Sequence, residues 1–338
     1  MLCTQFEYLY ECIMKHISCD DGSTSVKLAW FDGAELQTLV SPNSFRAGWK
    51  VEAMGAGKAF NYSIDGIKYT ADSVSREAIA TTNVEYQYGD MNLLAVHHAL
   101  LNSGMEPQKV SLTVTLPVSE YYDQDCQKNL ENIRRKKENL LRPLSLNRGV
   151  TFEIADVSVM PESLPAVFSQ LAKLQVGSLE TSLVIDLGGT TLDAAVVAGQ
   201  FEDVSTIHGN PGIGVSMITR AAQSALRNAG SETSALVADT VVRQRNDRDF
   251  LNQVINEADQ VSVVITTIES EIKSLGARVV TDLARWRNVN RVFLVGGGAA
   301  LIEPAVRRAW NLAPDRIIVI DEPQLALARE IALFKQED

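Results

Sequence analysis

The sequence is poor in the residues that build disulfide-bonded or metal-stabilised proteins. Its 338 residues include only four cysteines and four histidines. The cysteines have neither the paired spacing of a disulfide framework nor the short spacing of a metal site; they are Cys3, Cys12, Cys19 and Cys126. We therefore expect free thiols and a reducing compartment, which predicts a cytoplasmic protein.

The chain also lacks long apolar runs and an excess of positive charge. No apolar stretch approaches the roughly 20 residues that a membrane-spanning helix needs, and Met1–Ile13 has no basic start, so it does not resemble a secretory signal. Lys and Arg number 31 against 42 Asp and Glu, a net charge of −11. This balance argues against a broad surface for DNA or for a membrane. The length predicts two domains of about 150 residues each.

The most informative stretch is Ser182–Val197, with the sequence SLVIDLGGTTLDAAVV. A short apolar run ends at Asp186, two glycines and two threonines follow, and a second apolar run begins, which predicts a strand, a tight turn and a strand. Asp186 is well placed for a hydrated Mg²⁺, which prefers carboxylate and water ligands. The glycines allow backbone N–H groups to approach an anion, and the threonines add hydroxyl donors. The residues of this predicted phosphate-binding turn are Gly188, Gly189, Thr190 and Thr191.

One such turn is also common in ordinary hairpins, and it lacks the Gly-Lys-Ser/Thr ending and the following helix of a P-loop. The pattern is repeated near the start of the chain, however. In Ile17–Trp30 a carboxylate, a glycine and hydroxyls again separate two apolar runs. Two such hairpins, far apart in one chain, predict two similar lobes that hold one polyphosphate between them.

Two further segments carry candidate polar groups. The prolines after the strand Phe152–Val159 place Glu162 near the start of a helix, where it either complements the helix dipole or orients a water molecule. A glycine run follows the strand Arg291–Val295. It is not a complete dinucleotide fingerprint, because Leu301 stands where the third glycine would be. One turn at a helix N-terminus that touches a nucleotide is the better interpretation.

Helical patterns predict the remaining framework. Asn92–Asn102 has apolar residues at helical spacing. It contains the adjacent residues His97 and His98, whose side chains point in different directions on a helix, which favours packing over a shared metal. The basic run Arg134–Lys137 is predicted to be a solvated helix face. Gln260–Arg287 is predicted to be one long core-facing helix, with a coiled coil as the alternative.

Together these segments resemble the actin-like ATPase superfamily, and most specifically the plasmid-segregation actins of the ParM (StbA) type. The superfamily's first phosphate loop, first connecting segment, second phosphate loop and adenosine loop are similar, in order, to Ile17–Leu28, Val159–Ala166, Leu183–Asp193 and Phe293–Ile302. The narrower likeness is carried by CDDGSTSVKL, SPNSF, AVHHALL, TLPVSEYYD, ENIRRKK, VMPESLPA and IDLGGTTLD. It extends from about Lys15 to the last helix and is strongest as far as Asp193.

The resemblance implies an α/β chain with the actin-like (ribonuclease H-like/heat-shock-chaperone ATPase) two-lobed fold and a nucleotide cleft between the lobes. Residues 1–14 would be an extension that the family pattern does not include. Residues 15–180 would form the first lobe, with a small inserted subdomain at about 43–106, completed by a C-terminal helix at about 322–338. Residues 181–321 would form the second lobe, with an inserted subdomain at about 215–290.

The same resemblance assigns roles to the candidate residues. Glu162 and Asp186 would be catalytic: Glu162 would orient the attacking water, and Asp186 would hold Mg²⁺ through water. The phosphates would be held by Asp20, Gly22, Ser23, Thr24, Gly188, Gly189, Thr190 and Thr191. The adenosine would be bordered by Gly296, Gly297, Gly298 and Ala299.

The function that the resemblance implies is assembly of this chain with itself into a polar filament, driven by ATP and Mg²⁺, with GTP as an open alternative. Filament ends would bind a ParR-like adaptor on a centromere-like plasmid site, in the cytoplasm of a bacterium. Direct contact with DNA or a membrane is not expected. A sugar or acetate-type kinase of the same superfamily and a non-hydrolysing scaffold are the alternatives, although the chain has no recognisable substrate signature and no room for a peptide-binding domain.

Overall fold

The computed structural model describes residues 14–51 and 60–337; the predicted extension, apart from Met14, lies outside them. Two five-stranded sheets share one topology: three antiparallel strands are followed by two parallel ones. The first sheet has the order β3 (Glu35–Pro42), β2 (Ser25–Asp32), β1 (Lys15–Asp21), β7 (Lys109–Leu116) and β9 (Glu153–Pro161). The second has the order β12 (Asp203–Asn210), β11 (Leu192–Ala198), β10 (Thr181–Leu187), β13 (Arg291–Val295) and β14 (Ile317–Val319).

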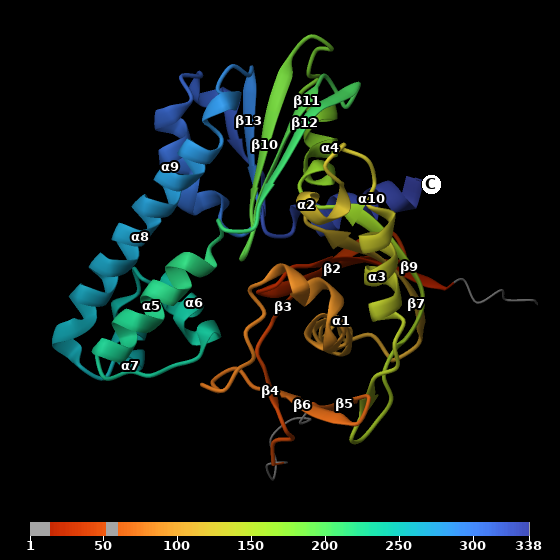
Figure 1. Ribbon diagram of the computed structural model, residues 1–338, viewed down its shortest axis with the longest axis vertical. Helices are drawn as coiled ribbons and strands as arrows, with labels where there is room; N and C mark the ends of the chain where they lie inside the picture. The colour runs from red at the N-terminus through yellow and green to blue at the C-terminus, as the bar shows by residue number, and fades with distance from the viewer. Residues whose placement is uncertain (1–13, 52–59, 338) are drawn as a thin grey trace, which may run out of the picture.

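A smaller four-stranded sheet lies at the far end of the first lobe (Figure 1). Its order is β4 (Phe45–Ala47), β6 (Ile67–Ala71), β5 (Asn61–Ile64) and β8 (Ser145–Leu146). The β5–β6 turn has positive φ at both Asp65 and Gly66, which is the backbone twist that a two-residue hairpin requires.

The helices cover the sheets in two groups. Those of the first lobe are η1 (Val84–Tyr88), α1 (Asp90–Asn102), α2 (Val118–Tyr121), α3 (Leu130–Leu140), η2 (Leu164–Val167) and α4 (Phe168–Lys173). Those that follow are α5 (Ser216–Asn228), α6 (Ala235–Arg243), α7 (Arg248–Val254), η3 (Ala258–Gln260), α8 (Val261–Asp282), η4 (Ala284–Trp286), α9 (Ala299–Ala309), η5 (Pro314–Arg316) and α10 (Ala326–Glu337). None of these helices is long and apolar enough to cross a membrane.

The second sheet is covered on both faces, which explains the continuous apolar runs of β10 and β11. One face packs against α5, α8 and α9, and the other against η2 and α10 (Figure 1). The predicted long helix is confirmed as α8, which buries Val264, Ile268, Leu275 and Val279 in the first of these cores. Packing of this one helix against α5 and α9, not a coiled coil, accounts for its apolar stripe.

Helix α10 joins the two sheets although it comes last in the chain. Its Leu327 and Ile331 pack with Val184 and Val295 of the second sheet, whereas Ala328 packs against Ala29 of the first. The helix also contacts β1, β2 and η2. Because its small and large apolar residues lie on different faces, one helix fills the junction between the lobes.

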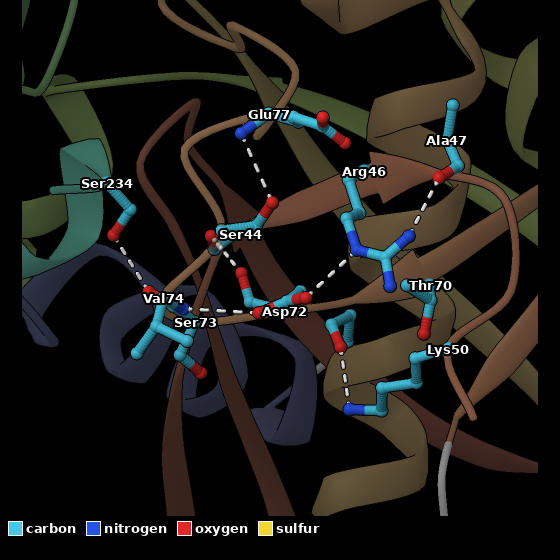
Figure 2. A network of polar contacts seen from close by, with 12 residues as sticks. Ser44, Arg46, Ala47, Lys50, Thr70, Asp72, Ser73, Val74, Glu77 and Ser234 are labelled. Carbon is cyan, nitrogen blue, oxygen red and sulfur yellow. Dashed lines mark hydrogen bonds and ion pairs between the residues drawn. The ribbon is translucent and has the colours of Figure 1, made fainter. Parts of the chain in front are cut away.

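A second contact between the lobes lies at the loop after β6. The Ser234 hydroxyl accepts a hydrogen bond from Val237 N at the start of α6 (3.1 Å) and donates one to Ser73 O (2.8 Å). Figure 2 shows that Asp72 anchors the same loop, since its carboxylate accepts from Arg46 Nε at 2.9 Å. An ion pair between Arg76 and Glu232 lies beside it. The loop after β6 and the segment before α6 therefore touch through polar groups.

The prediction of a solvated face for Arg134–Lys137 is wrong for one residue. Arg134 is exposed and pairs with Glu131 and Glu138, but Lys136 is completely buried. On a helix, residues three and four apart share a face, and Lys136, Asn139 and Leu140 are all buried in this way. The lysine side chain points inward because hydrogen-bond acceptors for its ammonium lie on that side of the helix.

The two histidines of α1 serve packing, as predicted. His98 Nδ1 hydrogen-bonds the Tyr62 hydroxyl at 2.7 Å, whereas His97 Nδ1 has no hydrogen-bond partner among the described residues. Burial lowers the pKa of His97 to about 4 and contributes most to lowering that of His98 to about 4. Both imidazoles are therefore neutral in the folded protein at neutral pH.

This burial predicts a loss of stability in acid. A histidine whose folded pKa lies below its unfolded value of 6.5 contributes stability that is present above pH 6.5 and is lost as the pH falls toward 4. For His97 alone, the loss of unfolding free energy from pH 7 to pH 5 should be about 2 kcal/mol. Urea unfolding of the wild type and of His97→Leu at both pH values measures it. Equal losses in the two proteins would contradict the prediction.

Candidate functional site

A cavity lies where the turns of the two similar hairpins meet. The β1–β2 turn reaches it from the first sheet and the β10–β11 turn from the second. The cavity brings together every predicted catalytic and phosphate-binding residue and part of the predicted adenosine loop. These lining residues are Asp20, Gly22, Ser23, Thr24, Glu162, Asp186, Gly188, Gly189, Thr190, Thr191, Gly296 and Gly297.

The two turns touch each other across the cavity. The hydroxyls of Ser23 and Thr190 hydrogen-bond at 2.6 Å. A Cβ atom added to Gly189 would lie 2.7 Å from the Thr24 hydroxyl oxygen, so only glycine permits this approach. Within the second turn, Gly188 N donates to Thr191 O at 2.9 Å. The result is a pair of hydroxyl- and amide-rich turns that face one another, which is suited to an anion held from both sides.

Acidic side chains crowd one wall of the cavity. Burial, with the nearby charges of Asp20 and Asp193, raises the pKa of Asp186 to about 8. Burial and the same two neighbours raise the pKa of Glu162 well above its ordinary value. Burial also raises the pKa of Asp20, although Lys27 lies beside it. The lining thus holds three carboxylates and one ammonium. Among the described residues no three His, Cys, Asp or Glu side chains converge on one metal position. A hard cation such as Mg²⁺, which accepts water beside carboxylate, would therefore be held here largely through water.

Lys27 is a site residue that sequence reasoning missed. It stands on β2 directly opposite Asp20 of β1, and its Nζ lies 3.0 Å from the Asp20 carboxylate. Burial alone would lower the pKa of Lys27, but the contact with Asp20 holds it above the ordinary value. The signal was present in the sequence, since cross-strand partners in a hairpin follow from the position of the turn.

A second cavity adjoins the first. The two share Thr24, Lys27, Gly188, Gly189 and Gly297. The rest of its lining comes mainly from α5, α6 and α9 and from the loops after α6 and before α10; it includes Ser216, Thr219, Asp239, Arg243, Arg245, Ala300, Leu301 and Gln324. Sequence reasoning did not select these residues. The polar stretch that contains α6 has no motif, and only its packing against α5 brings it to the site.

The predicted adenosine loop divides between cavity and core. Gly296 has a φ of 81°, and a Cβ there would lie 2.7 Å from Leu187 O. Gly296 and Gly297 line the first cavity, but Gly298 lines neither cavity because it packs against the Leu187 side chain. Ala299 is completely buried in the core of the second lobe. Helix α9 begins here, so its N-terminus faces the cleft, an arrangement that favours negative charge.

Comparison with family models shows where the chain belongs. Residues 14–173 match the family described as plasmid segregation protein ParM, N-terminal, and residues 176–334 match plasmid segregation protein ParM, C-terminal. The chain belongs to the ParM family. The predicted family is thus confirmed over almost the whole chain. No curated protein matches the sequence at a significant level.

Solved structures share the fold of this ParM-family chain. The archaeal actin homologue Ta0583, in complex with ADP, is 15% identical and has a TM-score of 0.68, covering 96% of this chain and 100% of its own. The pCBH ParM non-polymerisable quadruple mutant is 15% identical (TM-score 0.71, 96% and 100% covered). A 15-stranded ParM filament from Clostridium botulinum is 14% identical (TM-score 0.69, 96% and 99% covered). The predicted α/β, actin-like fold class is confirmed.

Proposed function

We propose that this chain is an ATPase that assembles with itself into dynamic filaments with ATP and Mg²⁺. The observation that carries the proposal is the cavity between the two hairpin turns, where three carboxylates face hydroxyl- and amide-rich loops from both lobes. Two structures that share the fold, a ParM filament and an actin homologue in complex with ADP, support it. Family membership supports a role in plasmid segregation.

In this proposal the phosphates and the nucleoside of the nucleotide occupy the two adjoining cavities. The phosphates lie in the first cavity, where Ser23, Thr24, Thr190 and the backbone N–H of Gly189 donate hydrogen bonds, and Asp20, Gly22 and Gly188 shape the turns. The nucleoside lies in the second cavity, toward α6. GTP is the alternative nucleotide for the same site.

Asp186 and Glu162 take different roles in hydrolysis. A bound Mg²⁺ would supply charge neutralisation for the phosphates, held by Asp186 through water. The Glu162 carboxylate orients the attacking water and accepts its proton, a task that suits a buried acid with a raised pKa. The neighbouring Ser163 has a φ of 70°, and its backbone N–H contacts the Asp186 carboxylate. The connecting segment thereby holds Glu162 and Asp186 next to each other.

We propose the division into lobes on the same grounds, with 15–180 and the helix at about 322–338 on one side of the cleft and 181–321 on the other. Nucleotide bound between them would hold the lobes at one angle, and hydrolysis would release that constraint. The filament ends would bind a ParR-like DNA-binding adaptor in the bacterial cytoplasm. The net charge of −11 favours an adaptor over direct DNA contact.

The test is right-angle light scattering of the purified chain after addition of Mg-ATP, with phosphate release followed in the same sample. We expect scattering to rise and then to decay as phosphate appears. ADP and ATP with EDTA are the controls, and neither should support a rise. Phosphate release without scattering over a range of salt and protein concentrations would favour the kinase alternative. ATP binding with neither signal would favour a scaffold.

A further inference from the structure

A buried polar cluster lies directly behind the first phosphate loop. Strand β1 ends in two aspartates: Asp20 faces the cavity, and Asp21 points the other way and is completely buried. The Asp21 carboxylate accepts hydrogen bonds from Thr115 N (3.1 Å) and Asn92 Nδ2 (2.7 Å). It also forms an ion pair with Lys136 at 2.5 Å, and both side chains are fully shielded from solvent.

Lys136 uses its entire hydrogen-bonding capacity in this cluster. Its ammonium donates to Asp21 Oδ2, to Asn92 Oδ1 at 3.1 Å and to Gln87 Oε1. An ammonium has three N–H donors and no acceptor, so the three oxygens satisfy it. A buried charge pair contributes little net stability after desolvation. It does impose geometry, because each partner must present an oxygen to the lysine.

Gln87 connects this cluster to the nucleotide cavity. It belongs to η1, and its side chain lines the same cavity as Glu162 and Asp186 but not the second cavity. Lys136 requires its amide oxygen, so the amide nitrogen is turned away from the lysine. Gln87 Nε2 donates to no other residue in the described part of the chain, and it is not among the described buried atoms that lack a partner. The nitrogen is therefore open to the cavity.

We infer that Gln87 donates its amide N–H to the terminal phosphate of the bound nucleotide or to the attacking water, and that Lys136 is the positioning residue that sets this orientation. The inference rests on the proposed ATPase function and adds to it a residue from η1. The energetic reason is preorganisation: a donor already held by a buried ion pair does not need to reorganise when negative charge develops. The same ion pair fixes Asp21, and with it the phosphate loop that begins at Gly22.

The first test compares Gln87→Met and Gln87→Glu with the wild type. Met keeps the shape but loses both the donor and the oxygen that Lys136 uses, whereas Glu keeps the oxygen for Lys136 and loses only the N–H. Both should lower kcat for phosphate release by about 10²-fold, the typical cost of removing one preorganised donor. The affinity for ADP, which lacks the terminal phosphate, should change less than threefold. Glu85→Gln, on the exposed face of the same η1 segment, is the matched control and should retain wild-type turnover.

The second test examines Lys136 through a pair replacement that leaves no buried charge unpaired. The double variant Lys136→Met with Asp21→Asn should also lower kcat, and adding Gln87→Met to it should cause little further loss, since residues that act as one unit are not additive. Wild-type turnover in Gln87→Met, or a full additional 10²-fold loss in the triple variant, would overturn the inference. If the wild type itself releases no phosphate, the proposed function fails instead, so the two failures are distinguishable.

Discussion

Asp186→Asn is expected to abolish Mg²⁺-dependent hydrolysis while leaving the free protein folded. Burial raises the pKa of Asp186 to about 8, so without a cation this carboxyl is protonated at pH 7, and asparagine resembles that state closely. The stability of the free protein should therefore hardly change. The carboxylate that a hard cation requires is lost, and we expect phosphate release to fall by about 10³-fold or more, since charge neutralisation supplies much of the catalysis in phosphoryl transfer.

Calorimetric titration of ATP with Mg²⁺ and with EDTA checks this prediction alongside phosphate release. In the wild type, Mg²⁺ should tighten binding, and in Asp186→Asn that difference should disappear. Asp203→Asn, an exposed position on β12, is the matched control. Phosphate release at the wild-type rate in Asp186→Asn would remove Asp186 from the proposed role.

Glu162→Gln is expected to separate assembly from hydrolysis. The amide keeps the size of the side chain and removes the carboxylate that accepts a proton from water, which typically costs 10²- to 10⁴-fold in rate. Nucleotide and metal binding should persist, because the donors from both hairpin turns remain. Scattering after addition of Mg-ATP should then rise as in the wild type and decay far more slowly.

The measurement is the ratio of the scattering lifetime to the rate of phosphate release. The control is Glu153→Gln, because Glu153 begins the same strand, β9, and is exposed; it should behave as the wild type. Decay and phosphate release that both remain at wild-type rates would contradict a role for Glu162. Loss of the scattering rise itself would show that Glu162 is needed for assembly rather than for hydrolysis.

The hairpin turns show why much of this site was accessible from the sequence. The approach of Gly189 to Thr24 and the positive φ of Gly296 depend on the absence of a side chain. A glycine in the sequence therefore indicates such a position directly. The Asp–Lys pairing of Asp20 and Lys27 follows from the hairpin register, so it could have been predicted once the turn was placed. The Asp20–Lys27 pair and the φ of Gly296 are local features. The approach of Gly189 to Thr24 is not local, and it was accessible only because the glycine turn is repeated within the chain.

Other features had no local signal. Lys136 belongs to a basic run that a solvated helix face would explain equally well, and only its acceptors on Asp21, Asn92 and Gln87 show that it is buried. The lining of the second cavity by Asp239 and Arg243 likewise depends on where α6 packs. In both cases the decisive partners are distant in the chain.

The sequence by itself determined the family, the actin-like fold class and the two turns that line the cavity. Backbone conformation, strand patterning and family motifs depend on residues that are neighbours in the chain. The tertiary structure alone decided which side of a helix faces a buried carboxylate, how far the glycine run reaches before Ala299 enters the core, and which helix closes the second cavity. The physical reason is that burial and charge pairing are properties of the assembled lobes. The groups in contact can lie more than a hundred residues apart in sequence, as Asp21 and Lys136 do.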